Sequence, residues 1–421
     1  MAGQIKEDLK NAFETLLDIP NVEIEKVEID KGGNYIVTIK STEKGTRCHK
    51  CGRAIHNSYG HDPLITLRHL PILGKQVYIR MRPARYQCSY CDDTPTTTQR
   101  LSWYEPRSPH TKAFEKHILL ACVNSTVWDV SIKEAIGYDA VMGIINRYVQ
   151  KEVNWEGIRK LDAIGLDEIS LKKRHKDFVT IVTGRIGEET LILGVLKDRM
   201  KATVKAFLLS IPKRLRRVVR AVCSDMYEGF INAAKEVFGK KVHLVVDRFH
   251  VAKLYRNGLE TLRKKELRRL KKQLSDTEYK ELKGVMWILR KREEDLTQED
   301  KVVLDKLFKH SPMLKRAHSF SNELTAIFDM DISKPHAKQK INGWMKRVKG
   351  SEIRCFDQFL TTLETYKDEI TNYFIDRYTS GFVEGLNNKV KVIKRRCYGI
   401  LNIQHLFQHI YLDLSGYSLY A

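Results

Sequence analysis

The sequence predicts a multidomain protein in which a mixed α/β core is interrupted by an all-α segment and preceded by a small metal-binding domain. Five short runs rich in Val, Ile and Leu fall between residues 161 and 247, whereas residues 248–375 show almost only helical periodicity. Two Cys-x-x-Cys pairs lie upstream of both regions. A length of 421 residues accommodates two to four such domains.

The composition is typical of a soluble globular chain that binds a polyanion. Hydrophobic residues make up 42% and charged residues 30%, and the formal net charge is +22. Excess positive charge of this size indicates nucleic acid as the partner. No window approaches eighteen apolar residues, and the first ten residues lack the apolar core of a signal peptide, so we expect a cytoplasmic protein.

The two cysteine pairs, Cys48 with Cys51 and Cys88 with Cys91, predict a zinc ribbon. Four thiolates in two close pairs form a closed tetrahedral Zn²⁺ site, which is structural because no position is left for water. The gap of 36 residues between the pairs is long for a ribbon, but the strand-like run 75–82 predicts that a longer hairpin fills it. The alternative is two unrelated pairs of reduced cysteines.

A helix-turn-helix follows the ribbon. Residues 127–136 and 139–149 have helical periodicity, and Gly137 lies between them as a tight turn. In such a motif the second helix enters the major groove of DNA, and Arg147 lies on this predicted recognition helix. The alternative is a helical hairpin with a purely structural role.

The order of the apolar runs predicts the topology of the core. Three strands follow one another, and helical segments 201–210 and 227–238 precede the fourth and fifth. Short turns between the first three favour an antiparallel meander, and helical crossovers favour parallel addition of the other two. This order is typical of a ribonuclease-H-like (retroviral-integrase-type) fold. The five runs are 161–167, 178–184, 190–196, 218–225 and 242–247.

Several of these predicted strands end in an aspartate, and this pattern predicts a divalent-metal site. Asp167 and Asp225 lie at strand ends, where an open α/β sheet binds its ligands, and Glu384 opens a basic helical segment far along the chain. Oxygen donors of this kind suit Mg²⁺ or Mn²⁺. We therefore predict that these three form one phosphoryl-transfer site, with Asp247 as the alternative to Asp225. The competing interpretation is three unconnected surface acids among the 52 of the chain.

Basic helices predict surfaces that follow a phosphate backbone. Between residues 248 and 275 ten Lys and Arg residues stand against two Glu, which favours nucleic-acid contact over a merely solvated helix face. After Glu384, cations recur at helical spacing on the same face. The predicted DNA-contacting cations in these segments are Arg263, Lys264, Lys265, Arg268, Arg269, Lys391, Lys394 and Arg395.

Four strings make the resemblance to a known family specific: GLDEIS (165–170), SDMYEGF (224–230), VVDRFHV (245–251) and TSGFVEGLNNKVKVIKRRCYG (379–399). With the order of predicted domains, they make nearly the whole chain similar to the DDE transposases of bacterial insertion sequences, ISL3 group. The resemblance implies Asp167 and Asp225 as the catalytic aspartates and Glu384 as the glutamate. It also implies Asp247 and His250 as accessory groups near the site.

What the resemblance implies is a DNA transposase that acts with catalytic Mg²⁺ (or Mn²⁺) and structural Zn²⁺. Such an enzyme binds insertion-sequence ends, cleaves them by metal-dependent phosphodiester hydrolysis and joins the 3′-hydroxyl ends to target DNA. Its partners would be double-stranded DNA, namely the terminal inverted repeats and the target, and a second copy or more of the chain, associated with the bacterial nucleoid. A DNA-binding regulator without catalysis and a ribonuclease-H-like nuclease that cuts without joining stay open as alternatives.

The predicted domain boundaries follow these features. They are an amino-terminal segment (1–47), the zinc ribbon (48–105), the helix-turn-helix domain (106–155), the first part of the catalytic core (156–254), the helical insertion (255–375) and the last core helices with Glu384 (376–421).

Overall fold

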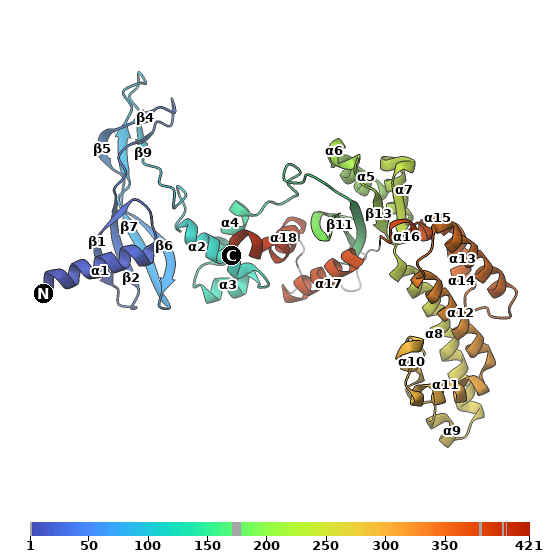
Figure 1. Ribbon diagram of the computed structural model, residues 1–421. Helices are drawn as coiled ribbons and strands as arrows, with labels where there is room; N and C mark the ends of the chain where they lie inside the picture. Colours follow the sequence, from blue (N-terminus) through green and yellow to red (C-terminus); the bar gives the residue numbers. More distant parts are fainter. Residues whose placement is uncertain (1, 171–177, 379–380, 398–399, 401) are drawn as a thin grey trace. The chain divides into compact units, whose positions relative to one another are not determined.

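The computed structural model describes residues 2–170, 178–378, 381–397, 400 and 402–421, with the backbone alone for 2–9 and 381–384. The chain forms two compact units (Figure 1). The first is Met1–Val149 with Tyr411–Ala421, and the second is Gln150–Ile410. In the parts of the chain described, no helix has both the length and the apolar character needed to cross a membrane.

The first unit combines an amino-terminal helix, three small sheets and three further helices. Its elements before the second unit are α1 (Ala2–Leu17), β1 (Val22–Ile29), β2 (Tyr35–Ser41), β3 (Thr46–Arg47), β4 (Ala54–Ile55), β5 (Asn57–His61), β6 (Ile65–Ile72), β7 (Lys75–Met81), β8 (Ala84–Gln87), β9 (Thr96–Thr98), α2 (Lys112–Cys122), α3 (Val127–Lys133) and α4 (Tyr138–Tyr148).

The largest sheet of this unit has the strand order β1-β2-β7-β6. The antiparallel pair β6–β7 is the hairpin predicted between the cysteine pairs. The hairpin is not part of the sheets beside the cysteines. Strand β7 pairs in parallel with β2, so the hairpin belongs to the sheet formed by the segment that precedes Cys48. Phe13 and Leu17 of α1 pack with Ile24 and Ile79 in the apolar core of this sheet. The cysteines lie beside two smaller sheets, β3-β4 and β5-β8-β9.

Helices α2, α3 and α4 form a small apolar bundle, and α3 and α4 confirm the two predicted helices. Thr126 caps α3 by accepting a hydrogen bond from the Asp129 backbone N–H, as short polar residues do at helix starts. The turn differs from the prediction: Ala135 has the positive φ of 51°, whereas Gly137 is extended and begins α4. Leu412, from the carboxy-terminal segment, completes the core of this bundle.

The second unit begins with the predicted strands and continues into helices. Its elements are β10 (Ala163–Ser170), β11 (Phe178–Ile186), β12 (Glu189–Leu196), α5 (Lys201–Ser210), α6 (Lys213–Arg216), β13 (Ala221–Ser224), α7 (Glu228–Phe238), η1 (Gly239–Lys241), β14 (His243–Val246), α8 (Arg248–Gln273), α9 (Asp276–Lys280), α10 (Val285–Ile288), η2 (Glu293–Asp295), α11 (Gln298–His310), α12 (Pro312–Asp329), α13 (Lys334–Lys349), α14 (Asp357–Thr365), α15 (Lys367–Thr371), α16 (Tyr373–Asp376), α17 (Gly381–Arg396) and α18 (Ile403–Tyr420), whose last residues belong to the first unit.

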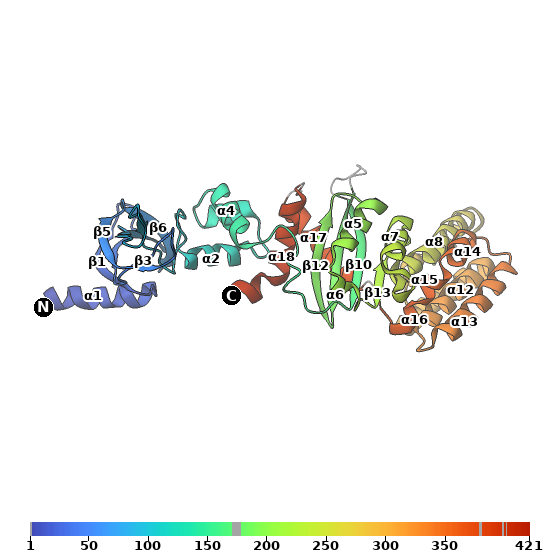
Figure 2. The ribbon, with the colours of Figure 1, turned by 90° about the horizontal axis from the view of Figure 1, so that it is seen from above.

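The five strands form one mixed sheet in the order β12-β11-β10-β13-β14 (Figure 2). β10, β11 and β12 are an antiparallel meander, and β13 and β14 add in parallel, as predicted. Alternate residues face opposite sides of the sheet. Ile164 and Val222 pack in the apolar core formed with α5, α6 and α7, whereas Ala163, Ala221 and Cys223 belong to the core that includes α8.

The helices between β14 and α17 supply most of the core that they share with one face of the sheet, and each buries an apolar stripe there, which explains why 248–375 show helical periodicity. Trp344, Phe328 and Phe356 are almost fully buried in it. Gly258 of α8 lies so close to the backbone of Cys355 that a Cβ at position 258 would stand 2.2 Å from the Cys355 carbonyl oxygen. A glycine inside a helix usually costs stability, and here it permits this close packing of α8.

Candidate active site

The strand register brings three aspartates to one edge of the sheet. Leu166 of β10 pairs with Ser224 of β13, and Ser224 pairs with Val246 of β14. The next residues are Asp167, Asp225 and Asp247. Neighbouring strands lie about 4.8 Å apart, so Asp225 occupies the middle position and is adjacent to both other aspartates. Asp247 is one strand farther from Asp167, which favours Asp225 as the partner of Asp167.

Asp167 is a partly buried carboxylate that accepts two hydrogen bonds. Its Oδ1 accepts from the Glu168 backbone N–H at 2.7 Å, and its Oδ2 accepts from the side-chain amide of Asn387. Burial raises the pKa of Asp167 to about 6, and the neighbouring Asp225 and Asp247 carboxylates add to this rise. A carboxylate in this setting is stabilised by any cation that approaches it.

Asp225 and Asp247 are each fixed by a local turn. Asp225 Oδ1 accepts from the Tyr227 N–H at 3.0 Å, and burial raises its pKa. Asp247 is buried and caps α8 by accepting from the backbone N–H two residues later at 2.9 Å. His250 lies one turn into α8 with Nε2 3.8 Å from Asp247 Oδ2, and its electrostatic contribution lowers the pKa of both Asp167 and Asp225.

Asn387 is a residue of this site that the sequence did not indicate. Its Nδ2 donates to Asp167, whereas its buried Oδ1 accepts no hydrogen bond from any part of the chain that the structure describes. Buried carbonyl oxygens rarely lack a partner, so this atom is available to an external donor or cation. Glu384 precedes it by three residues in α17, and the side chain of Glu384 lies outside the described residues.

The donors at this edge fit a hard divalent cation. Asp167, Asp225 and the unpartnered Asn387 Oδ1 offer oxygen atoms, which Mg²⁺ and Mn²⁺ prefer. Among the described residues, the four cysteines are the only group of three or more His, Cys, Asp or Glu side chains placed to hold a metal ion. A further oxygen, at position 384 of α17 or from water, is therefore needed to complete coordination.

The ion pair between Glu168 and Arg199, beside the aspartates, was also not predicted from the sequence. Glu168 Oε2 accepts from Arg199 at 2.5 Å, and the Arg199 guanidinium lies 4.7 Å from the ring centroids of Phe178 and Tyr227. Cation–π contacts of this kind fix the orientation of the guanidinium. The only feature of the sequence that could have pointed to Glu168 is its position directly after Asp167. No feature pointed to Arg199, its partner 31 residues further along the chain.

The four cysteines have the geometry of a tetrahedral metal site. Their sulfur atoms all lie within 4.8 Å of one another, and the Cys51–Cys88 and Cys88–Cys91 sulfur pairs are 3.7 Å apart. A tetrahedron with Zn–S bonds of about 2.3 Å has sulfur–sulfur edges of about 3.8 Å. The Cys51 backbone N–H lowers the pKa of Cys48 to about 6, which favours the thiolate that zinc requires. The residues present therefore fit structural Zn²⁺.

Several of the predicted DNA-contacting cations are paired with a carboxylate, and the exposed Lys264 also lies 3.6 Å from Glu260. Arg263 is paired with Glu260 at 2.6 Å and Arg269 with Glu266 at 2.7 Å. Lys394 is half-buried and donates to the backbone carbonyl of Ser170. The remaining cations have exposed side chains, and for all of them DNA contact stays a prediction. These exposed cations are Lys264, Lys265, Arg268, Lys391 and Arg395.

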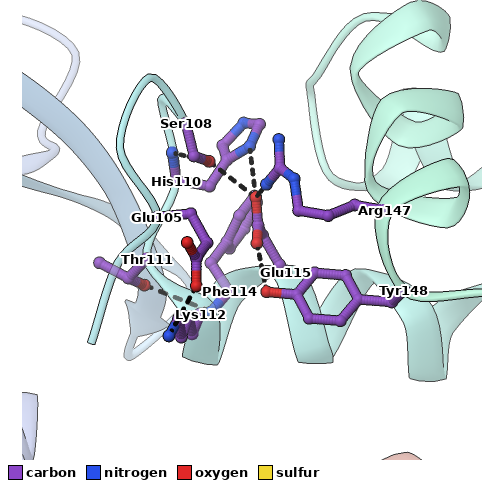
Figure 3. Close-up of polar contacts among 9 residues, drawn as sticks. All are labelled: Glu105, Ser108, His110, Thr111, Lys112, Phe114, Glu115, Arg147 and Tyr148. Carbon is purple, nitrogen blue, oxygen red and sulfur yellow. Dashed lines mark hydrogen bonds and ion pairs between the residues drawn. The ribbon is translucent and has the colours of Figure 1, made fainter. Parts of the chain in front are cut away.

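Arg147, near the end of α4, takes part in a polar network around the fully buried Glu115 of α2 (Figure 3). Glu115 accepts from the Arg147 guanidinium, from Ser108 Oγ at 2.7 Å and from the Tyr148 hydroxyl at 2.7 Å. His110 lies 4.0 Å from the same carboxylate. The network joins α2 to α4 and holds Arg147 against its own domain, so a contact of Arg147 with DNA stays a prediction.

Replacing Glu115 by Ala is expected to loosen the three-helix bundle by about 2–4 kcal/mol. The change leaves Ser108 and Tyr148 without their acceptor and Arg147 without its counter-ion, and the partial exposure of Arg147 (38%) reduces the cost. Hydrogen exchange of the α2 and α4 amides measures the effect. Glu134→Ala, which breaks the more exposed contact with His117, is the control and should cost less than about 1 kcal/mol. Equal loss of protection in both variants would contradict the structural role of Glu115.

Comparison with known proteins gives a consistent assignment along the whole chain. A family model described as transposase matches residues 164–410, the helix-turn-helix domain of transposase family ISL3 matches 99–149, and the zinc-finger of transposase IS204/IS1001/IS1096/IS1165 matches 44–91. The transposase for insertion sequence element IS1001 of Bordetella parapertussis is 25% identical over 400 residues, covering 93% of this chain and 95% of the relative. The transposase for IS1557 of Mycobacterium tuberculosis is 22% identical over 429 residues, covering 95% and 93%.

The transposase model alone spans more than half of the chain and contains the strands with Asp167, Asp225 and Asp247. The zinc-finger model contains all four clustered cysteines, and the helix-turn-helix model contains α2, α3 and α4. The order of zinc ribbon, helix-turn-helix and DDE domain thus agrees with the sequence prediction. The chain belongs to the ISL3 family of insertion-sequence transposases.

Proposed function

We propose that this chain cleaves the ends of an insertion sequence by metal-dependent hydrolysis and joins the resulting 3′-hydroxyls to target DNA. The observation that carries the proposal is the pair of partly buried aspartates, Asp167 and Asp225, which follow paired residues at one edge of the mixed sheet. Asn387 ties α17 to Asp167, which supports a contribution of α17 to this site.

The strand topology supports a ribonuclease-H-like core, which is part of the same proposal. The strand order β12-β11-β10-β13-β14, with the first three strands antiparallel and the last two parallel, agrees with the order expected for that fold. The helices from α8 to α16 separate the strands from α17 and would constitute its insertion. We propose the boundaries 156–254, 255–375 and 376–421 for these parts of the core and its insertion, with Tyr411–Ala421 grouped with the first unit.

In the proposed mechanism Asp167, Asp225 and Glu384 would hold two divalent cations. Bound there, the cations would supply electrostatic stabilisation of an in-line displacement at phosphorus. Asp247 holds the start of α8 in place, and His250 lies beside Asp247 with Nε2 3.8 Å from its Oδ2. We assign no Ser, Tyr or Cys nucleophile, because water and then the 3′-hydroxyl serve as the attacking groups.

DNA binding would be divided between the two units. The zinc ribbon and the helix-turn-helix would recognise the terminal inverted repeats, and the N-terminal residues of a recognition helix usually contact the bases. In α4 that end carries Tyr138 and Asp139, both exposed. The exposed cations Lys264, Lys265 and Arg268 would follow the phosphate backbone. Because transposition joins two ends, we propose a homodimer or a larger assembly on DNA.

One assay tests this function against the two alternatives. The protein is incubated with Mg²⁺, a labelled duplex of the terminal repeat that flanks its coding sequence, and a supercoiled target plasmid. We expect labelled end joined covalently to plasmid. Nicked duplex without joined product would instead identify a nuclease, and a gel shift without any cleavage would identify a DNA-binding regulator.

A further inference from the structure

The helical segment contains a cationic pocket that the catalytic site does not use. It lies between α8, α12 and the stretch from α10 to Arg292, with a volume of about 510 Å³. Pockets that enclose small organic ligands occupy roughly 300–1,000 Å³, so this pocket is large enough for one nucleotide.

Three kinds of side chain in the pocket each match one part of a nucleotide, and the hydroxyls of Ser321 and Thr325 complete the lining. Phe249, Leu259 and Met286 contribute apolar surface, and Phe249 is 50% exposed. Asn257 and Asn322 contribute carboxamides, which pair with the donor and acceptor edges of bases. The lining also holds six cations and, among the described residues, a single carboxylate, Glu260. The cations are Lys253, Arg256, Arg263, Arg290, Lys291 and Arg292.

Two of these cations are available to a phosphate. Glu260 pairs with Arg263 at 2.6 Å and lies 3.7 Å from Arg290. Lys253 and Arg256 form no ion pair with any residue in the described parts of the chain. Charge complementarity therefore favours an anionic ligand whose phosphate reaches Lys253 and Arg256.

The pocket begins close to the aspartates. Asp247 caps α8, and Phe249 lies two residues further along the chain. Lys253 and Arg256 follow Asp247 by six and nine residues, which corresponds to roughly 9 and 14 Å along a helix axis. A DNA strand held at the aspartates could therefore place a nearby nucleotide of the same substrate in this pocket.

We propose that the pocket binds one unpaired nucleotide of the DNA substrate. The base stacks on Phe249 and presents its edge to Asn257 and Asn322, while the adjacent phosphate meets Lys253 and Arg256. Taking a base out of a duplex costs energy, and the cost is smallest where the base is already unpaired. The inference rests on the proposed function, since it assumes that the substrate is DNA.

The test compares two duplexes of roughly three helical turns. One carries a single bulged 2-aminopurine nucleotide, and the other is fully paired. We expect the protein to bind the bulged duplex about 5- to 100-fold more tightly, the range typical of stacking one base on an aromatic side chain, with a change in 2-aminopurine fluorescence on binding. Equal affinity with unchanged fluorescence overturns the inference. Displacement of the bulged duplex by comparable concentrations of free deoxyadenosine monophosphate would also overturn it, in favour of a free nucleotide.

Variants locate the effect in the pocket. Phe249→Ala with Asn322→Ala should remove the preference for the bulged duplex while affinity for the paired duplex is kept. Lys253→Gln with Arg256→Gln should weaken binding of the bulged duplex. Lys315→Gln with Arg316→Gln, two exposed cations of α12 outside the pocket, makes the same change in charge and should keep the preference. A preference that survives the first pair of substitutions overturns the inference.

These binding measurements need no catalysis, so the pocket proposal and the catalytic proposal can be tested independently of each other. If the bulged duplex is not preferred but the joining assay succeeds, the pocket proposal fails and the transposase function stands. If the preference is found but no cleavage occurs, the pocket proposal stands as DNA binding and the catalytic proposal fails.

Discussion

Replacing Asp167 by Asn is expected to abolish DNA cleavage, by at least about 10³-fold, and to make the metal-free protein more stable. The loss of cleavage follows from the loss of an ionised oxygen donor at the proposed cation site. The gain in stability follows from burial, which raises the pKa of Asp167 to about 6. A rise of about two in the pKa of Asp167 corresponds to roughly 3 kcal/mol of unfolding free energy. Asn has one acceptor oxygen instead of two, so it loses one of the two hydrogen bonds that Asp167 accepts, which reduces the net gain to about 1–2 kcal/mol.

The pH dependence of the free energy of unfolding shows whether ionised Asp167 destabilises the folded protein. Because the folded state binds the Asp167 proton more tightly than the unfolded state does, stability falls as pH rises from about 4 to 6, and the full cost is present above pH 6. Thermal unfolding at neutral pH and at pH 4, with and without Mg²⁺, measures it. Asp167→Asn should gain stability only at neutral pH and should not respond to Mg²⁺, whereas the unsubstituted protein should be stabilised by Mg²⁺.

Asp162, just before the same strand, is the matched control. Burial opposes its ionisation, but Lys160 and the Gly187 N–H together hold the pKa of Asp162 below its usual value. Asp162→Asn should therefore lower stability and leave cleavage intact. If Asp167→Asn cleaves DNA at the rate of the unsubstituted chain, the assignment of Asp167 is wrong; if both variants lose stability alike, the electrostatic account of the site is wrong.

The sheet of the second unit was predictable because its strands are buried on both faces. Strands of this kind appear in sequence as continuous apolar runs, and their order along the chain restricts the topology. The positions of Asp167 and Asp225 followed from the same reasoning, since both close such runs. Asn387 could not be found in this way, because its hydrogen bond to Asp167 spans 220 residues and nothing local to Asn387 distinguishes it from its neighbour Asn388.

The amino-terminal unit was less predictable because its contacts are long-range or depend on loops. The parallel pairing of β2 with β7 joins segments on either side of a cysteine pair, which no local pattern indicates. The carboxy-terminal segment also has a role that sequence did not suggest, since Leu412 packs in the three-helix bundle and Asp413 accepts from the Asn124 backbone N–H at 2.8 Å. Buried Glu115 appeared in the sequence only as one acid among many.

Removal of zinc, by chelation or by Cys88→Ser, is expected to unfold the cysteine-bearing sheets and leave the sheet β1-β2-β7-β6 folded. The apolar core around the cysteines is very small, with Ile55 and Tyr86 as the only buried residues besides Cys48 and Cys88 among those described. Zinc binding supplies about 10–16 kcal/mol to comparable small domains, far more than such a core can. The sheet β1-β2-β7-β6 has its own core, with Phe13, Leu17 and several strand residues.

Hydrogen exchange separates the two sheets, because β8 and β9 should lose protection when zinc is removed while β2 and β7 keep it. Zinc content, measured by mass spectrometry of the native protein, should fall from one ion per chain to none in Cys88→Ser. Cys355→Ser, a cysteine of the second unit, should retain both the ion and the protection. Because an unfolded ribbon cannot hold a fixed surface against DNA, affinity for the terminal repeat should fall with the protection of β8 and β9. Full protection of these strands in the zinc-free protein would show instead that the four thiols pack without a metal.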